Sequence, residues 1–135
     1  MTEITVEQYR AYQKTGALPK YRNQPMVYEG VRFDSKAELQ FEMRLRLLKA
    51  AGRVQWWLHQ VPFLMPRNLE TAKAKRYLLD FLVFQADAET FMPRLRFVDV
   101  KGFLTKESAL KIQTTEATYG IKIEIVKREG IETWG

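Results

Sequence analysis

The sequence has no cysteine and a single histidine, His59. Without cysteine, a disulfide framework, a thiolate metal site and a cysteine nucleophile are excluded, and one histidine cannot build a histidine-based zinc site. No apolar run approaches the roughly 18 residues needed to span a membrane. The N-terminal stretch MTEITVEQYRAYQKTG is charged throughout and lacks the apolar segment of a signal peptide. We therefore expect a soluble, cytoplasmic protein with no membrane partner.

The chain has 135 residues, the size of one ordinary domain that can bury a core without disulfides or metals. Its 22 Lys and Arg residues outnumber its 16 Asp and Glu residues, for a net charge of +6. A basic excess favours a polyanionic partner such as DNA, although many basic domains bind nothing anionic.

The pattern of apolar residues predicts an arm at residues 1–34 and a core domain at residues 35–135. Within the arm, residues 6–14 are a short helical candidate, and Gly, Pro and Asn interrupt any regular period afterwards. A strong helix begins after Ser35 and stops at Gly52. Its apolar stripe consists of Ala37, Phe41, Leu45 and Leu48.

Three strands are expected next, followed by a helix and a last strand. The first strand is rich in Val and Trp and ends against Pro62. The second is the apolar run RYLLDFLVFQ, and the third runs from Leu95 to Lys101. The second helix spans residues 105–119, with Gly120 as its stop. Its inward positions are expected to be Ala109, Ile112 and either Glu116 or Ala117, and the alternating segment IKIEIVKR is the last strand.

The segment RLRFVDVKGFLT places Asp99 and Lys101 two positions apart on one strand. Side chains of a strand alternate between two faces, so this acid and this amine share a face, while Val98 and Val100 share the other. The simplest interpretation is a solvent-facing ion pair on a half-exposed sheet. The competing interpretation is that a chemical reaction at this site needs the carboxylate and the amine on the same side of the strand.

Asp80 lies in the middle of an apolar run, where an unpaired carboxylate costs several kcal/mol. It must have a partner, and a buried salt bridge or a hydrogen bond to a loop would satisfy it. A hairpin would bring it near Asp99, and two carboxylates repel unless a cation lies between them. Mg²⁺ suits this arrangement because it prefers oxygen ligands. Lys101 would then lie beside the metal, where it can orient or help deprotonate an attacking water.

Glu38 is a further candidate with a strong structural alternative. Ser35 and Glu38 form an S-x-x-E capping box, in which the glutamate folds back onto the N-cap amide. On a helical wheel, however, Glu38 lies beside Leu45 at the edge of the apolar stripe, from where it could face the acids.

Glu38 in a helix, Asp80 in a second strand and DVK at 99–101 in a third strand, with a helix and strand after them, resemble the PD-(D/E)XK nuclease superfamily. The blocks GVRFDSKAELQFEMRL, HQVPF, RYLLDFLVF, VDVKG and YGIKI are similar to small phage and prophage endonucleases related to Holliday junction resolvases and phage endonuclease I. The resemblance covers roughly residues 30–127 and implies an α/β, restriction-endonuclease-like core with a mixed sheet flanked by helices.

The resemblance also implies roles for individual residues. Asp80, Asp99 and the Val100 carbonyl would bind the metal, Glu38 would join them directly or through a water, and Lys101 would be the catalytic lysine. Two positions depart from the commonest motif. Leu79 replaces the proline before the first acid, and Asp99 replaces the usual glutamate, which leaves the coordination geometry open.

These observations predict a Mg²⁺-dependent DNA endonuclease, with Mn²⁺ as a substitute metal. By resemblance, the substrate is branched DNA such as a Holliday junction in phage recombination or replication, and the protein is a homodimer. Gln60, Arg76, Lys106 and Lys111 are weaker candidates for DNA contacts. Two alternatives stay open: a nuclease for linear duplex or single-stranded DNA, and a non-catalytic basic DNA-binding domain.

Overall fold

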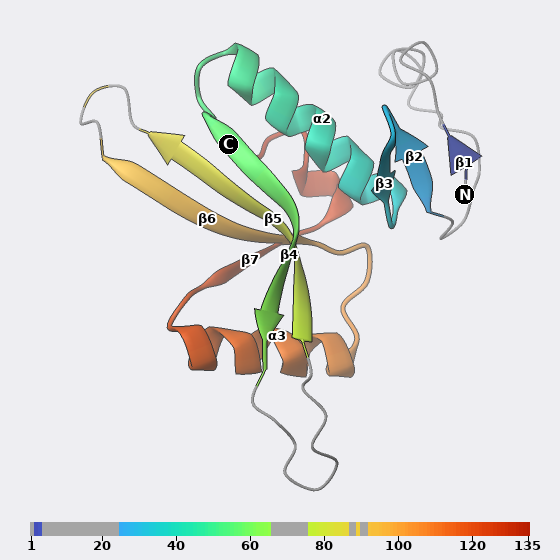
Figure 1. Cartoon of the computed structure of the whole chain (residues 1–135), viewed down its shortest axis with the longest axis vertical. Helices are drawn as coiled ribbons and strands as arrows, with labels where there is room; N and C mark the ends of the chain where they lie inside the picture. The colour runs from blue at the N-terminus through green and yellow to red at the C-terminus, as the bar shows by residue number, and fades with distance from the viewer. Residues whose placement is uncertain (1, 4–24, 66–75, 87–88, 90–91) are drawn as a thin grey trace, which may run out of the picture. The chain divides into compact units, whose positions relative to one another are not determined.

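The computed structural model describes residues 2–3, 25–65, 76–86, 89 and 92–135. The chain is mixed α/β and falls into two compact units, residues 1–43 and residues 44–135 (Figure 1). The predicted helix at residues 6–14 lies outside the described residues. None of the helices in the described part is long and apolar enough to cross a membrane.

The elements follow the predicted order from residue 36 onward: helix, three strands, helix, strand. In chain order they are β1 (Thr2–Glu3), β2 (Met26–Tyr28), β3 (Val31–Phe33), α2 (Lys36–Ala50), β4 (Trp56–Leu64), β5 (Arg76–Ala86), β6 (Pro93–Val100), α3 (Lys106–Tyr119), β7 (Ile123–Val126) and the 3-10 turn η1 (Arg128–Gly130).

The first unit contains a small sheet that the sequence analysis did not predict. β2 pairs with β1 in parallel and with β3 in an antiparallel hairpin. Glu29 and Gly30 join β2 to β3 with φ angles of 49° and 79°, the backbone of a two-residue type I′ turn. Residues 26–33 are therefore a hairpin rather than an irregular lead-in. Glu-Gly is a weaker turn signal than Asn-Gly, and strands of three residues are too short to show alternation.

Helix α2 agrees with the prediction and passes from the first unit into the second. The four residues of its apolar stripe are all buried, between 0 and 9% exposed. Gly52 follows the helix with a φ of 76°, and its amide donates to the Lys49 carbonyl oxygen at 3.0 Å. A left-handed glycine at this position closes the last turn, as the sequence predicts.

The second unit is built on a four-stranded mixed sheet of order β4-β5-β6-β7. β5 is antiparallel to both of its neighbours, β4 and β6, and β7 pairs with β6 in parallel. The prediction that a strand ends at Pro62 is wrong, because β4 continues to Leu64 and Pro62 pairs with Leu78. As an edge strand, β4 tolerates a proline whose nitrogen cannot donate to a further strand.

Helix α3 packs against this sheet through a small apolar cluster. Ile112 of α3 lies with Tyr77 and Leu79 of β5 and Ile123 of β7, and Figure 1 shows the helix crossing one end of β4 and β5. Thr115, not Glu116 or Ala117, is the second inward residue of α3: it is fully buried, and its hydroxyl donates to the Lys111 carbonyl at 2.8 Å.

The ends of α3 agree with the prediction. The Thr105 hydroxyl caps the first turn by accepting from the Ser108 amide at 3.0 Å. Gly120 ends the helix with a φ of 65°. The helix therefore ends at the predicted glycine and begins one residue after Thr105, which is its N-cap.

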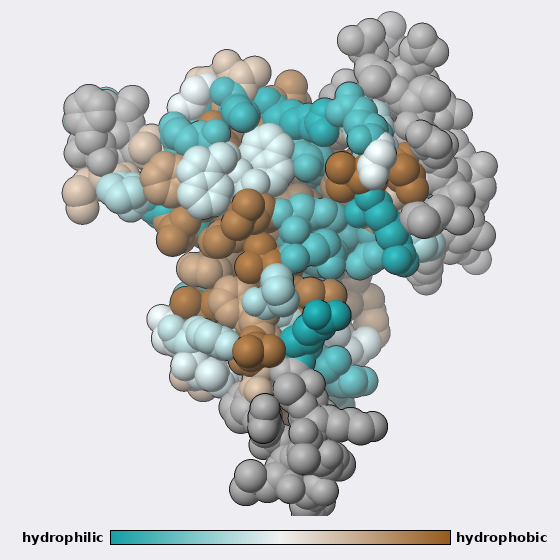
Figure 2. Space-filling model, in the orientation of Figure 1, coloured by the Kyte–Doolittle hydropathy of each residue, from teal (hydrophilic) through white to brown (hydrophobic). Residues whose placement is uncertain are grey.

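One region of the sheet carries exposed apolar side chains. Trp56 of β4 stacks on Phe84 of β5 with ring centroids 5.0 Å apart, and Leu95 of β6 continues this row. Trp56, Leu58 and Leu95 remain 42–51% exposed. Figure 2 shows hydrophobic side chains in brown at the centre of the view, where β4 lies in Figure 1. Large exposed apolar patches commonly mark interaction surfaces; we call these three residues the sheet patch.

Candidate metal centre

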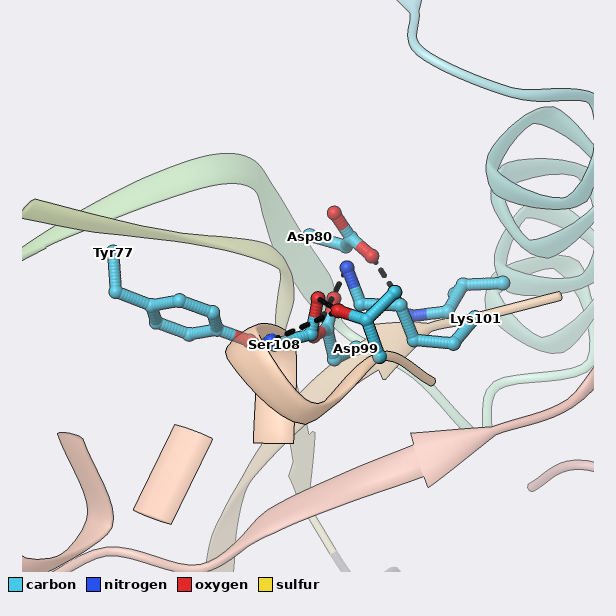
Figure 3. Close-up of polar contacts among 7 residues, drawn as sticks. Tyr77, Asp80, Asp99, Lys101 and Ser108 are labelled. Carbon is cyan, nitrogen blue, oxygen red and sulfur yellow. Dashed lines mark hydrogen bonds and ion pairs between the residues drawn. The ribbon is translucent and has the colours of Figure 1, made fainter. Parts of the chain in front are cut away.

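The end of the β5–β6 ladder brings the two predicted acids together. The last paired residues are Phe81 and Val98, so Asp80 and Asp99 occupy the next opposed positions. The Val100 amide, which has no β5 partner in this ladder, donates to Asp80 Oδ2 at 2.8 Å. The Asp80 carboxylate thus accepts the hydrogen bond that a main-chain carbonyl of β5 would otherwise accept, at the point where the two strands separate. Figure 3 shows both acids beside Lys101.

Asp99 is completely buried, and its two oxygens have different surroundings. Oδ2 accepts a hydrogen bond of 2.6 Å from the Tyr77 hydroxyl and lies 3.6 Å from Lys101 Nζ. Oδ1 is buried and accepts no hydrogen bond from any described residue. Such an oxygen is rare in folded proteins and calls for an explanation such as a bound ion.

The pKa of Asp99 is raised to about 8. Burial is the largest cause, and the Asp80 carboxyl adds to it through hydrogen bonding and charge repulsion. The hydrogen bond from Tyr77 and the charge of Lys101 act in the opposite direction. A hydrogen bond between the two carboxyl groups requires one of them to be protonated; when both are ionised, Oδ1 has no donor, and the pair repels.

Tyr77 is a site residue that the sequence analysis missed. Its pKa is raised well above the usual range, first by burial and then by its hydrogen bond to Asp99 and by nearby carboxylates, so the hydroxyl remains a donor. One tyrosine among the apolar residues of a strand gives a weak signal. A buried tyrosine nonetheless needs a partner for its hydroxyl, and this requirement could have pointed to the acids.

Lys101 follows β6, and its side chain is 29% exposed. The simple interpretation of Asp99 and Lys101 as a solvent-facing ion pair is wrong in one respect: the two groups do pair, but the carboxylate is buried. Val98 and Val100 are buried on the other face, as predicted. An ammonium group at the edge of a buried carboxylate pair offsets part of its negative charge.

Glu38 belongs to the first unit, and its local role is clear. Its amide donates to the Ser35 hydroxyl at 3.2 Å, which is one half of the predicted capping box. Its carboxylate accepts from the Asp34 amide at 2.7 Å, one residue earlier than a capping box predicts. Glu38 is 3% exposed. Its place among the metal ligands stays a prediction.

Gln60 has an unusual backbone for a strand residue. It lies in β4 between the pairs His59–Phe81 and Val61–Leu79, at the position opposite Asp80. Its φ is 59°, in the left-handed region that glycine favours. Strained residues of this kind are concentrated at functional sites.

The other predicted DNA contacts lie on exposed surface. Arg76 begins β5 and Lys106 begins α3, both exposed. Lys111 pairs with Glu107 one helical turn away, with Nζ and Oε1 3.5 Å apart. These positions suit contacts to phosphates but carry no sign of a specific site, so their role stays a prediction.

Within the described ranges, no three His, Cys, Asp or Glu side chains form a ready-made metal cluster. The acids nevertheless fit a hard divalent cation. Mg²⁺ commonly takes only one or two protein carboxylates and completes its shell with waters and substrate oxygens. The donors at the β5–β6 junction are all oxygens, and the buried Asp99 Oδ1 lacks the hydrogen bond that would otherwise satisfy it.

Comparison with known proteins gives one result. No curated protein and no solved structure matches the chain. Residues 18–129, which include Asp80, Asp99, Lys101 and Tyr77, match the family described as "Protein of unknown function (DUF1064)". Because the match spans most of the sequence, the chain belongs to the DUF1064 family.

Proposed function

We propose that this chain is a metal-dependent DNA endonuclease of the PD-(D/E)XK type that hydrolyses phosphodiester bonds in branched DNA. The observation that carries the proposal is the buried pair of Asp80 and Asp99 with Lys101 at its edge. Element order and the mixed sheet agree with a restriction-endonuclease-like core. The net charge of +6 suits a polyanionic substrate.

The ligands in this proposal are oxygens of Asp80 and Asp99 and the Val100 carbonyl. A strand residue presents its N–H and C=O on the same edge, so the Val100 carbonyl lies on the edge where its amide meets Asp80. Bound Mg²⁺, or Mn²⁺ in its place, would act as a Lewis acid that activates a water and neutralises charge on the phosphate.

Lys101 has the second role in the proposed reaction. Its ammonium group is partly exposed and pairs with Asp99, so it can donate a hydrogen bond to a water or phosphate oxygen beside the carboxylates. It would orient the attacking water and offset charge that develops on the phosphate oxygens. Arg76 and Lys106 would bind neighbouring phosphates, with the salt dependence typical of such contacts.

Cleavage assays test the substrate class. A four-way junction, the matched linear duplex and the matched single strand are each incubated with Mg²⁺, with Mn²⁺ and with chelator. We expect metal-dependent cutting that prefers the junction. Equal cutting of all three would refute the branched substrate but not the nuclease. DNA binding without cutting in either metal would favour the non-catalytic DNA-binding domain.

Substitutions test the site itself. Asp80→Asn and Lys101→Met should each lower the cleavage rate by about 100-fold or more while the protein still binds DNA. Lys122→Met is the matched control, since it removes the same charge from an exposed lysine before β7. If the Lys101 and Lys122 variants cut equally well, the site assignment is wrong.

We also propose that the active form is a homodimer, because a junction must be cut on two strands and a two-fold dimer supplies two sites. The sheet patch of Trp56, Leu58 and Leu95 supports this by its exposed apolar area. Leu58→Lys should convert the dimer to a monomer in light scattering. A wild-type chain that is monomeric at all concentrations would refute the dimer.

A further inference from the structure

The Tyr77 hydroxyl is held in place by the packing of its ring. The ring is 7% exposed and lies in the cluster with Leu79, Ile112 and Ile123, which joins β5, α3 and β7. Its hydroxyl reaches Asp99 Oδ2 at 2.6 Å, from the strand next to β6 (Figure 3). A rigid donor at this distance restricts the rotation of the Asp99 carboxylate.

This bond makes the two oxygens of Asp99 inequivalent. Oδ2 has the tyrosine hydroxyl and the Lys101 ammonium group near it. Oδ1 is buried and accepts no hydrogen bond from the described residues. At Asp80, the Val100 amide donates a hydrogen bond to Oδ2. At both acids, therefore, a protein donor occupies one oxygen.

Divalent cations differ in how they use a carboxylate. Mg²⁺ is small and demands a near-octahedral shell, whereas Ca²⁺ takes six to eight oxygens and often binds both oxygens of one carboxylate. A carboxylate with one oxygen already engaged is a poor two-oxygen ligand. Such a carboxylate favours the smaller ion.

We propose, on the basis of the metal site of the proposed nuclease, that Tyr77 is a positioning residue that makes Asp99 a one-oxygen ligand through Oδ1 and thereby selects Mg²⁺ over Ca²⁺. A purely structural hydrogen bond would affect all cations alike. A positioning bond affects them differently, because only Ca²⁺ gains from the release of Oδ2.

The test measures dissociation constants of the full chain for Mg²⁺, Mn²⁺ and Ca²⁺ separately by calorimetry, without DNA. Tyr77→Phe keeps the ring in the core and removes only the hydroxyl. We expect Mg²⁺ to bind 10- to 100-fold more weakly, the usual effect of losing a partner of a metal ligand. Ca²⁺ should bind as well as before or more tightly, so the preference for Mg²⁺ over Ca²⁺ falls at least tenfold.

Tyr119→Phe is the matched control. Its hydroxyl also donates a hydrogen bond, to the Leu64 carbonyl, and its ring packs on Phe63 with centroids 5.0 Å apart. This variant should leave the cation preference unchanged. If Tyr77→Phe weakens Mg²⁺ and Ca²⁺ equally, the positioning role is refuted and the metal site stands. If the wild-type chain binds none of the three ions, the metal site and the proposed function both fail.

A second comparison, between Asp99→Asn and the double variant with Tyr77→Phe, tests the proposal without relying on the Tyr77→Phe single variant. In Asp99→Asn, the single oxygen accepts from Tyr77, which leaves the amide nitrogen facing the cation, so Mg²⁺ binding should be lost. Adding Tyr77→Phe frees this oxygen to turn, so the double variant should bind Mg²⁺ more tightly than Asp99→Asn. A double variant that binds no better overturns the proposal.

Discussion

Replacing Asp99 with asparagine should stabilise the metal-free protein at high pH, although the residue is fully buried and hydrogen-bonded. The substitution removes a negative charge that faces Asp80 and keeps an oxygen that can accept the Tyr77 hydrogen bond. Most substitutions of buried residues destabilise a protein. Here the charge itself opposes folding.

The magnitude follows from the pKa of Asp99, which is raised from 3.8 to about 8. Roughly four pH units at about 1.4 kcal/mol each give an upper limit near 6 kcal/mol. Because effective dielectric constants are high even at buried sites, we expect about 2–4 kcal/mol in the free energy of unfolding. Between pH 4 and 8 the folded chain binds a proton that the unfolded chain releases, so this contribution to stability is lost as pH rises.

Urea unfolding in chelator at pH 5.5, 7 and 8.5 measures the effect. The difference between Asp99→Asn and the wild type should shift in favour of the variant by about 1–3 kcal/mol from the lowest to the highest pH, because this range covers only part of the interval between the two pKa values. Glu107→Gln removes a charge from an exposed side chain and should show no such trend. A difference for Asp99→Asn that is the same at all three pH values would refute the electrostatic reasoning.

Mg²⁺ should remove most of the stability advantage of the variant at pH 8.5. At a concentration 100 times its dissociation constant, a ligand that binds only the folded state adds about 2.7 kcal/mol of stability. The wild type should gain this stability at pH 8.5, and the variant should gain almost none. A variant stabilised by Mg²⁺ as much as the wild type would mean that Asp99 is not a ligand.

Three further predictions concern the fold. Gln60→Gly should be about 1 kcal/mol more stable than Gln60→Ala in urea unfolding, the reverse of the usual order in strands, because φ at this residue is 59°; the ordinary order would contradict this backbone. Arg96→Met should lower the free energy of unfolding by about 1–3 kcal/mol, because the Arg96 side chain is 12% exposed and donates to Glu124 through two nitrogens. Its Cζ also lies 4.1 Å from the centroid of the Trp134 ring. A loss below about 0.5 kcal/mol would mean that the pair with Glu124 is not stabilising. Gly120→Ala should lower the free energy of unfolding by about 1 kcal/mol through backbone strain alone, because an added methyl group meets no atom within 4 Å while φ is 65°; an unchanged free energy of unfolding would argue against a left-handed cap.

The sequence alone determined the elements whose signals are local. The stripe of Ala37, Phe41, Leu45 and Leu48 sets the buried face of α2, because helical spacing places these residues on one side. A carboxylate in an apolar strand requires a partner. This requirement at Asp80 predicts a polar site where β5 lies beside β6. The β2–β3 hairpin was not predicted, because strands of three residues are too short to show an alternating pattern.

Only the tertiary structure decided how the site is built. Alternation along a strand says which residues share a face, but burial depends on what packs over that face, and Asp99 therefore proved buried rather than solvent-facing. The bond from Tyr77 to Asp99 joins residues 22 positions apart and depends on the register of β5 against β6 and on the packing of one ring. Contacts of this kind arise from pairing between distant segments, and no local pattern encodes the distance between two side chains.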